Sequence, residues 1–250
     1  MDYSTFRNAY SHNMRTAEHL TNLIKTRVDS TAEFALLLGA GASATSGVIT
    51  ASEMVKQWRK TLFASYQGGD NYNDWIAKQD WHNFDDEYSR LFEAVYDQPS
   101  QRRAFIENAV KDAKPSWGYA YLVSLIQKKI FNIIFTTNFD DLINESCYMF
   151  SDMIRPLVCA HDSAVSSIRV ISDRPKVIKL HGDFLYDSIK NTSSELQSLE
   201  ANMRDKFTEF ARGYGLVVCG YGGNDKSVMD LLEVLIRSTS YFMHGIYWCI

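Results

Sequence analysis

Residues 34–47 read Phe34-Ala-Leu-Leu-Leu-Gly39-Ala-Gly41-Ala-Ser43-Ala44-Thr-Ser46-Gly47, and this stretch decides the fold. The apolar, uncharged residues 34–38 predict a strand buried on both faces, as in a parallel sheet covered by helices. Gly39 and Gly41 then permit a turn to which a ligand can approach closely. The pattern Gly39-x-Gly41-x-x-Ala44 satisfies the relaxed dinucleotide fingerprint, in which loop N–H groups receive a pyrophosphate. An ordinary strand-to-helix turn explains it equally well, because no acidic ribose ligand follows about 20 residues later.

Length and composition describe an ordinary globular chain. Its 250 residues are 46% hydrophobic and 22% charged. The net charge of −4 gives no general reason to bind nucleic acid or an acidic membrane surface. The sequence contains no apolar run of about 18 residues that would predict a transmembrane helix. The N-terminus has no hydrophobic signal region either, so the cytoplasm is the expected compartment.

The cysteines are Cys147, Cys159, Cys219 and Cys249, and none of them forms a Cys-x-x-Cys pair. This spacing excludes a structural zinc ribbon, and no metal is expected. Cys219 and Cys249 lie within apolar, strand-like runs, which predicts reduced thiols in the core. Disulfides are not expected in this setting.

Apolar periodicity predicts strands that alternate with helices along the rest of the chain. Strands are expected at residues 131–135, 168–171, 177–180, 216–220 and 246–250, and helices at 15–28, 50–62, after 116, from 142, within 193–212 and at 228–235. This alternation predicts an α/β fold with a Rossmann-like, doubly wound, mostly parallel sheet. Because a hydrophobic strand makes a poor terminus, we expect residues 1–250 to be one domain at the N-terminal end of a longer chain.

Residues 70–115 differ in character from the rest, being rich in aromatic and acidic side chains. The preferred interpretation is a small helical insert whose aromatic residues form a core of their own. The alternative is an aromatic ligand cleft against the main sheet.

Small and polar residues follow several of the predicted strands. Asn138 and Asp140 follow the strand at 131–135, His181 follows 177–180, and residues 220–225 follow 216–220. Each has a simpler explanation, since an Asx residue can cap a helix, a histidine can lie in the core and glycines can form a tight turn. The carboxyl ends of parallel strands nevertheless meet at one edge, where ligands bind in open α/β sheets. The sequence therefore predicts that these loops converge on one site.

Three stretches resemble, in order, the signatures of the sirtuin (silent information regulator) family. They are Gly39-Ala-Gly41-Ala-Ser43 with Ser46-Gly47, Thr137-Asn138-Phe-Asp140, and Leu180-His181-Gly182. The segment 220–225 resembles the divergent sirtuin-like domains of bacterial antiphage proteins. Two departures stand out: the zinc ribbon of deacylating sirtuins is missing, and Val48-Ile-Thr-Ala51 replaces their Pro-Asp-Phe-Arg. Without the ribbon the acyl-lysine groove would lack one wall, so the resemblance implies the branch that hydrolyses NAD⁺.

The resemblance also implies a role for each site residue. Asn138 would hold the attacking water or the ribose, and His181 would act as the base. Asp140 would hydrogen-bond the nicotinamide side or order its loop. The remaining residues would bind the rest of the substrate: Gly39, Ala40, Gly41 and Ser43 the pyrophosphate, with Ser46 and Thr137 beside them, and Gly220, Tyr221 and Asp225 the adenosine half. Asp225 could instead only cap its helix.

The resulting hypothesis is an NAD⁺ glycohydrolase that releases ADP-ribose and nicotinamide and depletes NAD⁺ in antiphage defence. By resemblance, its activity would depend on a homo-oligomer or on a sensor such as an Argonaute-type or oligomerising ATPase module. One alternative is an NAD-dependent protein deacylase or ADP-ribosyl transferase, which the missing ribbon disfavours. The other is a non-catalytic sensor that binds NAD or ADP-ribose.

Overall fold

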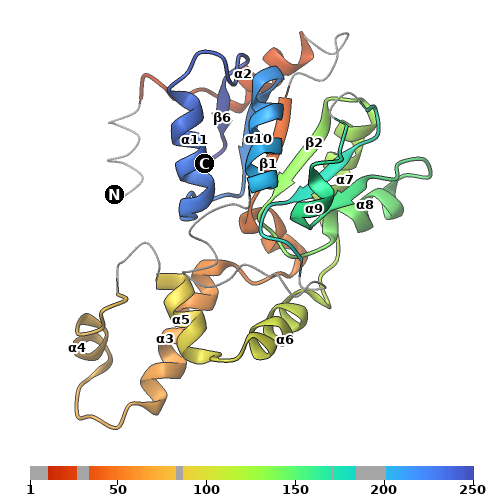
Figure 1. Ribbon diagram of the computed structural model, residues 1–250. Coiled ribbons are helices and arrows are strands. Elements are labelled where there is room, and N and C mark those ends of the chain that lie inside the picture. The colour runs from red at the N-terminus through yellow and green to blue at the C-terminus, as the bar shows by residue number, and fades with distance from the viewer. Residues whose placement is uncertain (1–10, 27–33, 83–86, 170–171, 184–200) are drawn as a thin grey trace.

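A single parallel sheet forms the centre of the protein (Figure 1). The computed structural model describes residues 11–26, 34–82, 87–169, 172–183 and 201–250. Its six strands lie in the order β3-β4-β2-β1-β5-β6, and every neighbouring pair is parallel. The strands are β1 (Phe34–Leu38), β2 (Phe131–Thr136), β3 (Leu157–Cys159), β4 (Lys176–Lys179), β5 (Gly215–Cys219) and β6 (Ile246–Trp248). The predicted Rossmann-like parallel sheet is confirmed.

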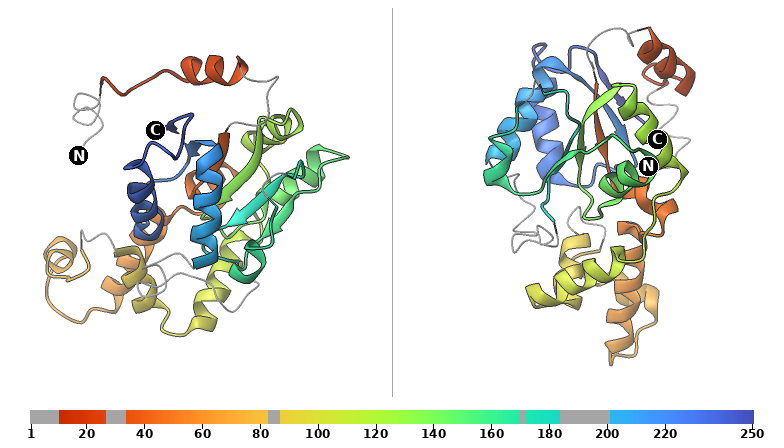
Figure 2. Two further views of the ribbon diagram at one scale, coloured as in Figure 1. Left: turned by 45° about the horizontal axis from the view of Figure 1, so that its top comes forward. Right: turned by 90° about the vertical axis from the view of Figure 1, so that its right-hand side faces the viewer.

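Helices cover both faces of the sheet, as the right-hand view of Figure 2 shows. Ala35 and Leu37 of β1 pack into the cluster formed with α9 (Asp162–Val165), α10 (Ala201–Gly213) and α11 (Lys226–Ile236). Phe34 and Leu36 point the other way, toward α2 (Ala17–Lys25), α7 (Trp117–Gln127) and α8 (Leu142–Phe150). Because successive side chains of a strand alternate between faces, a strand covered on both sides must be apolar throughout.

Four further helices form a helical unit beyond the edge at which the strands end (Figure 1). They are α3 (Ala51–Ser65), α4 (Tyr72–Ala77), α5 (Glu87–Val95) and α6 (Pro99–Val110). The unit has its own hydrophobic cluster, in which Trp58 of α3 stacks on Phe92 of α5 with ring centroids 4.8 Å apart. Since α3 contributes to this cluster, the helical unit extends upstream of the boundary at residue 70. A capping box of Thr50 and Glu53 begins α3, close to the start of the helix expected at residues 50–62.

The prediction of a strand at residues 168–171 was wrong at residues 168–169, which the structure describes. Ile168 is buried in the core but lies outside any strand, and residues 170–171 are outside the described part of the chain. The strand that pairs with β4 is β3, which is short and exposes its first two residues. A buried apolar residue that follows a short helix such as α9 gives the same sequence signal as the start of a strand.

The helix expected at residues 15–28 is shorter in its described part, whereas the polar helix expected within 193–212 is present wherever it is described. Helix α2 covers only Ala17–Lys25 of the expected 15–28, and α10 begins at Ala201. The remaining parts of these predictions, residues 27–28 and 193–200, lie outside the described residues. Among the helices that the structure describes, none has the length and apolar character that crossing a bilayer requires.

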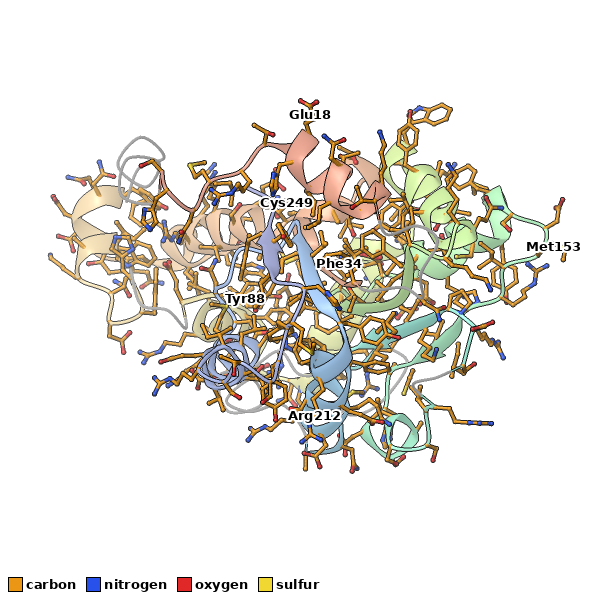
Figure 3. All side chains as sticks on the ribbon, turned by 90° about the horizontal axis from the view of Figure 1, so that it is seen from above. Glu18, Phe34, Tyr88, Met153, Arg212 and Cys249 are labelled. Atoms are coloured by element: carbon orange, nitrogen blue, oxygen red, sulfur yellow. The ribbon has the colours of Figure 1, made fainter. Side chains whose placement is uncertain are left out.

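The prediction of two core thiols near the end of the chain was wrong. Cys249 is exposed at the end of β6 (Figure 3), and Cys219 at the end of β5 is half-buried. Both lie at the ends of strands at or next to the edge of the sheet, where a hydrophobic run does not guarantee cover on both faces.

Candidate active site

The turns after β1 and β5 pack directly on one another. The N–H of Gly39 donates to the Cys219 carbonyl over 3.0 Å, and the N–H of Gly41 donates to the Gly220 carbonyl over 2.8 Å. A Cβ on Gly39 would lie 2.6 Å from the Gly220 oxygen, and one on Gly220 would lie 2.3 Å from the Ala42 nitrogen. Glycine is therefore required here for close contact between two backbones. Both N–H groups donate within the protein and are not available to a pyrophosphate. Gly39 and Gly41 can contribute to such a site only because, lacking a Cβ, they let a ligand approach the backbone closely.

After Gly39 the chain forms a short 3₁₀ helix, η1 (Ala40–Ser46), which brings Ser43 into the interior. Its hydroxyl donates to Oδ2 of Asp140 over 2.7 Å and accepts from Nδ2 of Asn138 over 2.9 Å. The hydroxyl of Tyr119 on α7 lies 2.8 Å from the same oxygen. A serine hydroxyl has one donor and two acceptor positions, so Tyr119 must be the donor in this contact. The four buried side chains thus form one saturated centre on Ser43.

Burial controls the charge of this centre. It raises the pKa of Asp140, against the opposing hydrogen bonds from Ser43 and the Leu142 N–H. Burial, together with the nearby Asp140 charge, also raises the pKa of Tyr119. The Tyr119 phenol therefore stays protonated at neutral pH and keeps donating to Ser43.

Asn138 is fixed in one orientation with its amide oxygen left over. Its Nδ2 donates to the Gly39 carbonyl over 3.1 Å as well as to Ser43, and a carbonyl can only accept, so the nitrogen must face this side. Its Oδ1 is buried and has no hydrogen-bond partner among the described residues. A buried polar atom without a partner is costly and marks a position where a ligand or water can bind.

His181 and Asp225 meet across the edge of the sheet. Nε2 of His181, in the turn after β4, lies 2.6 Å from Oδ2 of Asp225, which precedes α11. Oδ1 of Asp225 accepts from the Ser227 N–H over 2.9 Å, so the carboxylate also caps α11. Burial alone would raise the pKa of Asp225, but the close approach of His181, together with the hydrogen bonds from Ser227 and the α11 backbone, outweighs it and lowers that pKa. Asp225 caps its helix and also binds the predicted base.

A buried lysine joins the loops that carry these groups. Nζ of Lys179, at the end of β4, donates to the Phe139 carbonyl over 3.0 Å and to Oδ1 of Asp141 over 2.8 Å. It also pairs with Asp183. The lysine side chain is only 2% exposed, so these oxygen partners must replace its hydration.

The other predicted residues lie around this centre. The Ser46 hydroxyl accepts from the Ser116 N–H over 3.1 Å, which ties η1 to the start of α7 and leaves Ser46 outside the Ser43 network. Thr137 donates its N–H to the Leu38 carbonyl. Tyr221 is buried, and its ring stacks on Trp248. Ala40 is half-buried in η1. Their roles toward a substrate, like those of the other predicted site residues, stay predictions.

Two residues of the candidate site, Tyr119 and Lys179, were missed from the sequence. From the sequence, Tyr119 lay only within the helix expected after residue 116, and Lys179 only within the strand expected at 177–180. The one available signal was Lys179 itself, since a lysine between Ile178 and Leu180 in a strand buried on both faces requires acidic or carbonyl partners. Across the described residues, no group of three or more His, Cys, Asp or Glu side chains is arranged to hold a metal ion.

The sheet order and the two helical layers define a Rossmann-like α/β protein with a sirtuin-like fold. Among solved structures, one similar chain is a Sir2 homologue in complex with NAD, with a TM-score of 0.51 and 15% sequence identity; the match covers 91% of this chain and 81% of that one. Another is a Sir2 homologue in complex with ADP-ribose, with a TM-score of 0.49, 16% identity and coverage of 91% and 83%.

The sequence itself also matches a known family. Residues 132–250 match the model of the SIR2-like domain. This range includes Asn138, Asp140, His181 and Asp225, whereas the turn at Gly39 precedes it. None of the curated proteins matches the chain in sequence.

Proposed function

We propose that the protein is an NAD⁺ glycohydrolase, which cleaves the nicotinamide–ribose bond of NAD⁺ and releases ADP-ribose and nicotinamide. The observation that carries the proposal is the buried Asn138 amide, whose oxygen has no hydrogen-bond partner in the described part of the chain, at the same sheet edge as the His181–Asp225 pair. In open parallel sheets this edge is where ligands bind. The match of residues 132–250 to the SIR2-like domain supports a substrate related to NAD.

The groups at this edge suit hydrolysis. In the proposed reaction the bond between C1′ and the nicotinamide nitrogen breaks, and its electron pair passes to the nitrogen, which becomes neutral. Water adds to C1′ and gives up one proton. His181 accepts this proton, and the Asp225 carboxylate stabilises the imidazolium that forms. Asn138 Oδ1 accepts a hydrogen bond from the water or from a ribose hydroxyl, and so orients the reacting groups.

The same proposal assigns the binding residues. The turn at Gly39, Ala40, Gly41 and Ser43 lies against the pyrophosphate, and the turn at Gly220 and Tyr221 against the adenosine half. Asp140 and Tyr119 act through Ser43, because both bond to its hydroxyl. The sirtuin-like fold, one example of which was solved with NAD, supports this arrangement.

The sequence favours hydrolysis over transfer of an acyl group. Its four cysteines form no Cys-x-x-Cys pair, so the zinc ribbon that forms one wall of the acyl-lysine groove in deacylating sirtuins is missing. We further propose, from the resemblance to antiphage proteins, that a second copy or a sensor partner activates the enzyme. Constant loss of NAD⁺ would otherwise kill the cell.

Product analysis tests the proposal. The full-length protein, in its natural assembly, is incubated with NAD⁺, with and without an acetylated peptide, and the products are separated by chromatography. We expect ADP-ribose and nicotinamide in equal amounts and no dependence on the peptide. His181→Ala should lower the rate by about 10²–10⁴-fold, the usual contribution of a positioned base. Asn138→Ala should also lower it strongly.

Matched controls separate chemistry from folding. His19 is an exposed histidine on α2 and Asn144 is a partly exposed asparagine on α8, so His19→Ala and Asn144→Ala should leave the rate unchanged. Acetyl-ADP-ribose formed only with the peptide would instead identify a deacylase. Tight binding of NAD⁺ without turnover, unchanged by Asn138→Ala, would identify a nucleotide sensor.

A further inference from the structure

Two free thiols lie in contact at one side of the sheet. Sγ of Cys219 is 3.4 Å from Sγ of Cys249; Cys219 is the last residue of β5, and Cys249 directly follows the paired strand β6. Neither thiol has a part in the proposed hydrolysis. Cys147 and Cys159, by contrast, are buried in separate hydrophobic clusters.

The backbone places the two cysteines at a distance suited to a covalent link. Val218 pairs with Trp248, so Cys219 and Cys249 continue the same register by one residue, and the Cys249 N–H donates to the Val218 carbonyl over 2.8 Å. Neighbouring strands lie about 4.8 Å apart, which falls within the range of about 4.4–6.8 Å between the Cα atoms of disulfide-bonded cysteines. Closing the two sulfurs to bonding distance therefore needs only a small local movement.

The environments of the two thiols differ in the way a reactive pair requires. Cys249 is exposed, whereas Cys219 is half-buried and donates its S–H to Cys249. This hydrogen bond lowers the pKa of Cys249 to about 7. The same bond and burial raise the pKa of Cys219. A solvent-accessible thiolate beside a second thiol is the usual arrangement of a redox-sensitive cysteine.

We propose that Cys219 and Cys249 form an oxidisable dithiol, which a hydroperoxide converts reversibly into an intramolecular disulfide. The Cys249 thiolate attacks one peroxide oxygen, the O–O bond breaks, and the products are the Cys249 sulfenic acid and hydroxide. The Cys219 sulfur then attacks Sγ of Cys249, the S–S bond forms, and the sulfenic oxygen leaves as water. In total, two thiols and one hydrogen peroxide give one disulfide and two waters, and a dithiol reductant reverses the change.

The position of the pair connects it to the proposed active site. The carbonyl of Cys219 accepts the Gly39 N–H, and the next residue, Gly220, is the one that packs against Gly41 and Ala42. The disulfide would thus form at the end of the strand that supports the glycine turn. Its formation does not depend on the proposed hydrolysis.

Thiol counting with mass spectrometry tests the inference. The reduced full-length protein is exposed to hydrogen peroxide, then denatured and alkylated. We expect the cysteines at positions 219 and 249 to lose their reactivity together, the intact mass to fall by two hydrogen atoms, and a peptide to contain both residues joined. Dithiothreitol should restore alkylation of both. Wild-type protein in which both thiols remain alkylatable after peroxide would overturn the proposal, as would a disulfide between two chains.

Substitutions identify the roles of the two thiols. Cys219→Ser removes the resolving thiol, so Cys249 should accumulate as a sulfenic acid that dimedone traps, with no disulfide. Cys249→Ser should leave Cys219 reduced at the same peroxide concentration. Cys147→Val, at a fully buried position that accommodates an apolar side chain, should form the disulfide like the wild type. A Cys249→Ser protein that still loses the Cys219 thiol would contradict the assigned order of attack.

Discussion

The carboxylate of Asp225 binds His181 with one oxygen and caps α11 with the other. Nε2 of His181 lies 2.6 Å from Oδ2, while Oδ1 accepts from the Ser227 N–H. In the sheet, β4 and β5 are separated by β2 and β1, so the contact joins turns that follow non-neighbouring strands. One side chain therefore sets both the start of a helix and the position of an imidazole.

Replacing the charge of Asp225 separates these two functions. Asp225→Asn keeps an oxygen for the cap but removes the anion that stabilises protonated His181. We expect kcat for NAD⁺ hydrolysis to fall by about 10²-fold or more, within the contribution of a positioned acid–base pair, with little change in KM. Asp230→Asn, an exposed position on the same helix, is the matched control and should keep full activity. Equal rates for both variants would rule out a role for Asp225.

Ser43 should be important for stability as well as activity. Ser43→Ala removes three hydrogen bonds at once and leaves the Tyr119 hydroxyl and one Asp140 oxygen buried without this partner. We expect the free energy of unfolding to fall by about 1–3 kcal/mol, the usual cost of leaving buried polar groups unpaired. Urea denaturation measures this loss. Ser124→Ala, at an exposed serine on α7, should change the unfolding free energy by less than about 0.5 kcal/mol.

Two glycines with positive φ distinguish backbone strain from steric overlap. Gly220 has φ of 65°, and its added Cβ would meet the Ala42 nitrogen. Gly47 has φ of 91°, but its added Cβ would meet no described atom within 4 Å beyond its chain neighbours. Gly47→Ala should cost about 1–2 kcal/mol of unfolding free energy, from strain alone. Gly220→Ala should cost clearly more, because the turns after β1 and β5 must move apart. Thermal unfolding of both variants provides the comparison, and equal losses would show that the overlap relaxes freely.

Lys179 should be among the most sensitive buried positions. Lys179→Met keeps the length of the side chain. It removes the lysine charge from beside Asp141 and from beside Asp183, which is buried. Removing one partner of a buried ion pair costs about 3–5 kcal/mol, so we expect a large loss in urea denaturation. Lys129 pairs with Asp173 on the surface at 3.5 Å, and Lys129→Met should cost at most about 1 kcal/mol. Similar effects of the two substitutions would contradict the conclusion that Lys179 stabilises the fold by joining these loops.

Asp140 and Asp225 should influence stability with opposite dependence on pH. The folded-state pKa of Asp225 lies below 3.8, so its stabilisation is present above pH 3.8 and is lost as pH falls toward that lowered value. The folded-state pKa of Asp140 lies above 3.8, so its favourable contribution is present below pH 3.8 and is lost as pH rises through the raised value. Denaturation across acidic pH measures the unfolding free energy of the wild type and of each variant. The advantage of the wild type should grow with rising pH over Asp225→Asn and shrink with rising pH over Asp140→Asn.

The sequence was sufficient for the central strands because a strand buried on both faces is apolar throughout. The apolar residues 34–38 serve two hydrophobic clusters at once, and the polar turns at Asn138, His181 and Asp225 had to meet once the strands were parallel. The partners within the site left no comparable trace. Tyr119 reaches Ser43 from a helix 76 residues further along the chain, and no periodicity reports which apolar-face tyrosine also donates a hydrogen bond.

Short elements at the edges of the sheet were the least predictable. Strand β3 has three residues and exposes two of them, so it lacks both the length and the alternation that identify strands. Cys249 follows an apolar run but is exposed, because β6 is an edge strand with a neighbour on one side only. In both places tertiary position, which local sequence does not encode, decides exposure.

Phe139 stands between Asn138 and Asp140 in the sequence, but its side chain points away from theirs and toward the helical unit. It packs against the aromatic cluster of the helical unit, while its carbonyl binds Lys179. Opening of the helical unit would therefore remove one of the contacts that hold the segment carrying Asn138 and Asp140, which is also held by hydrogen bonds to Ser43 and Gly39. By thermodynamic reciprocity, a molecule that binds at the sheet edge and orders this segment stabilises the helical unit, and a molecule that grips the helical unit changes affinity at the sheet edge by the same factor. Phe139 is thus one contact through which binding at the sheet edge and the stability of the helical unit are coupled.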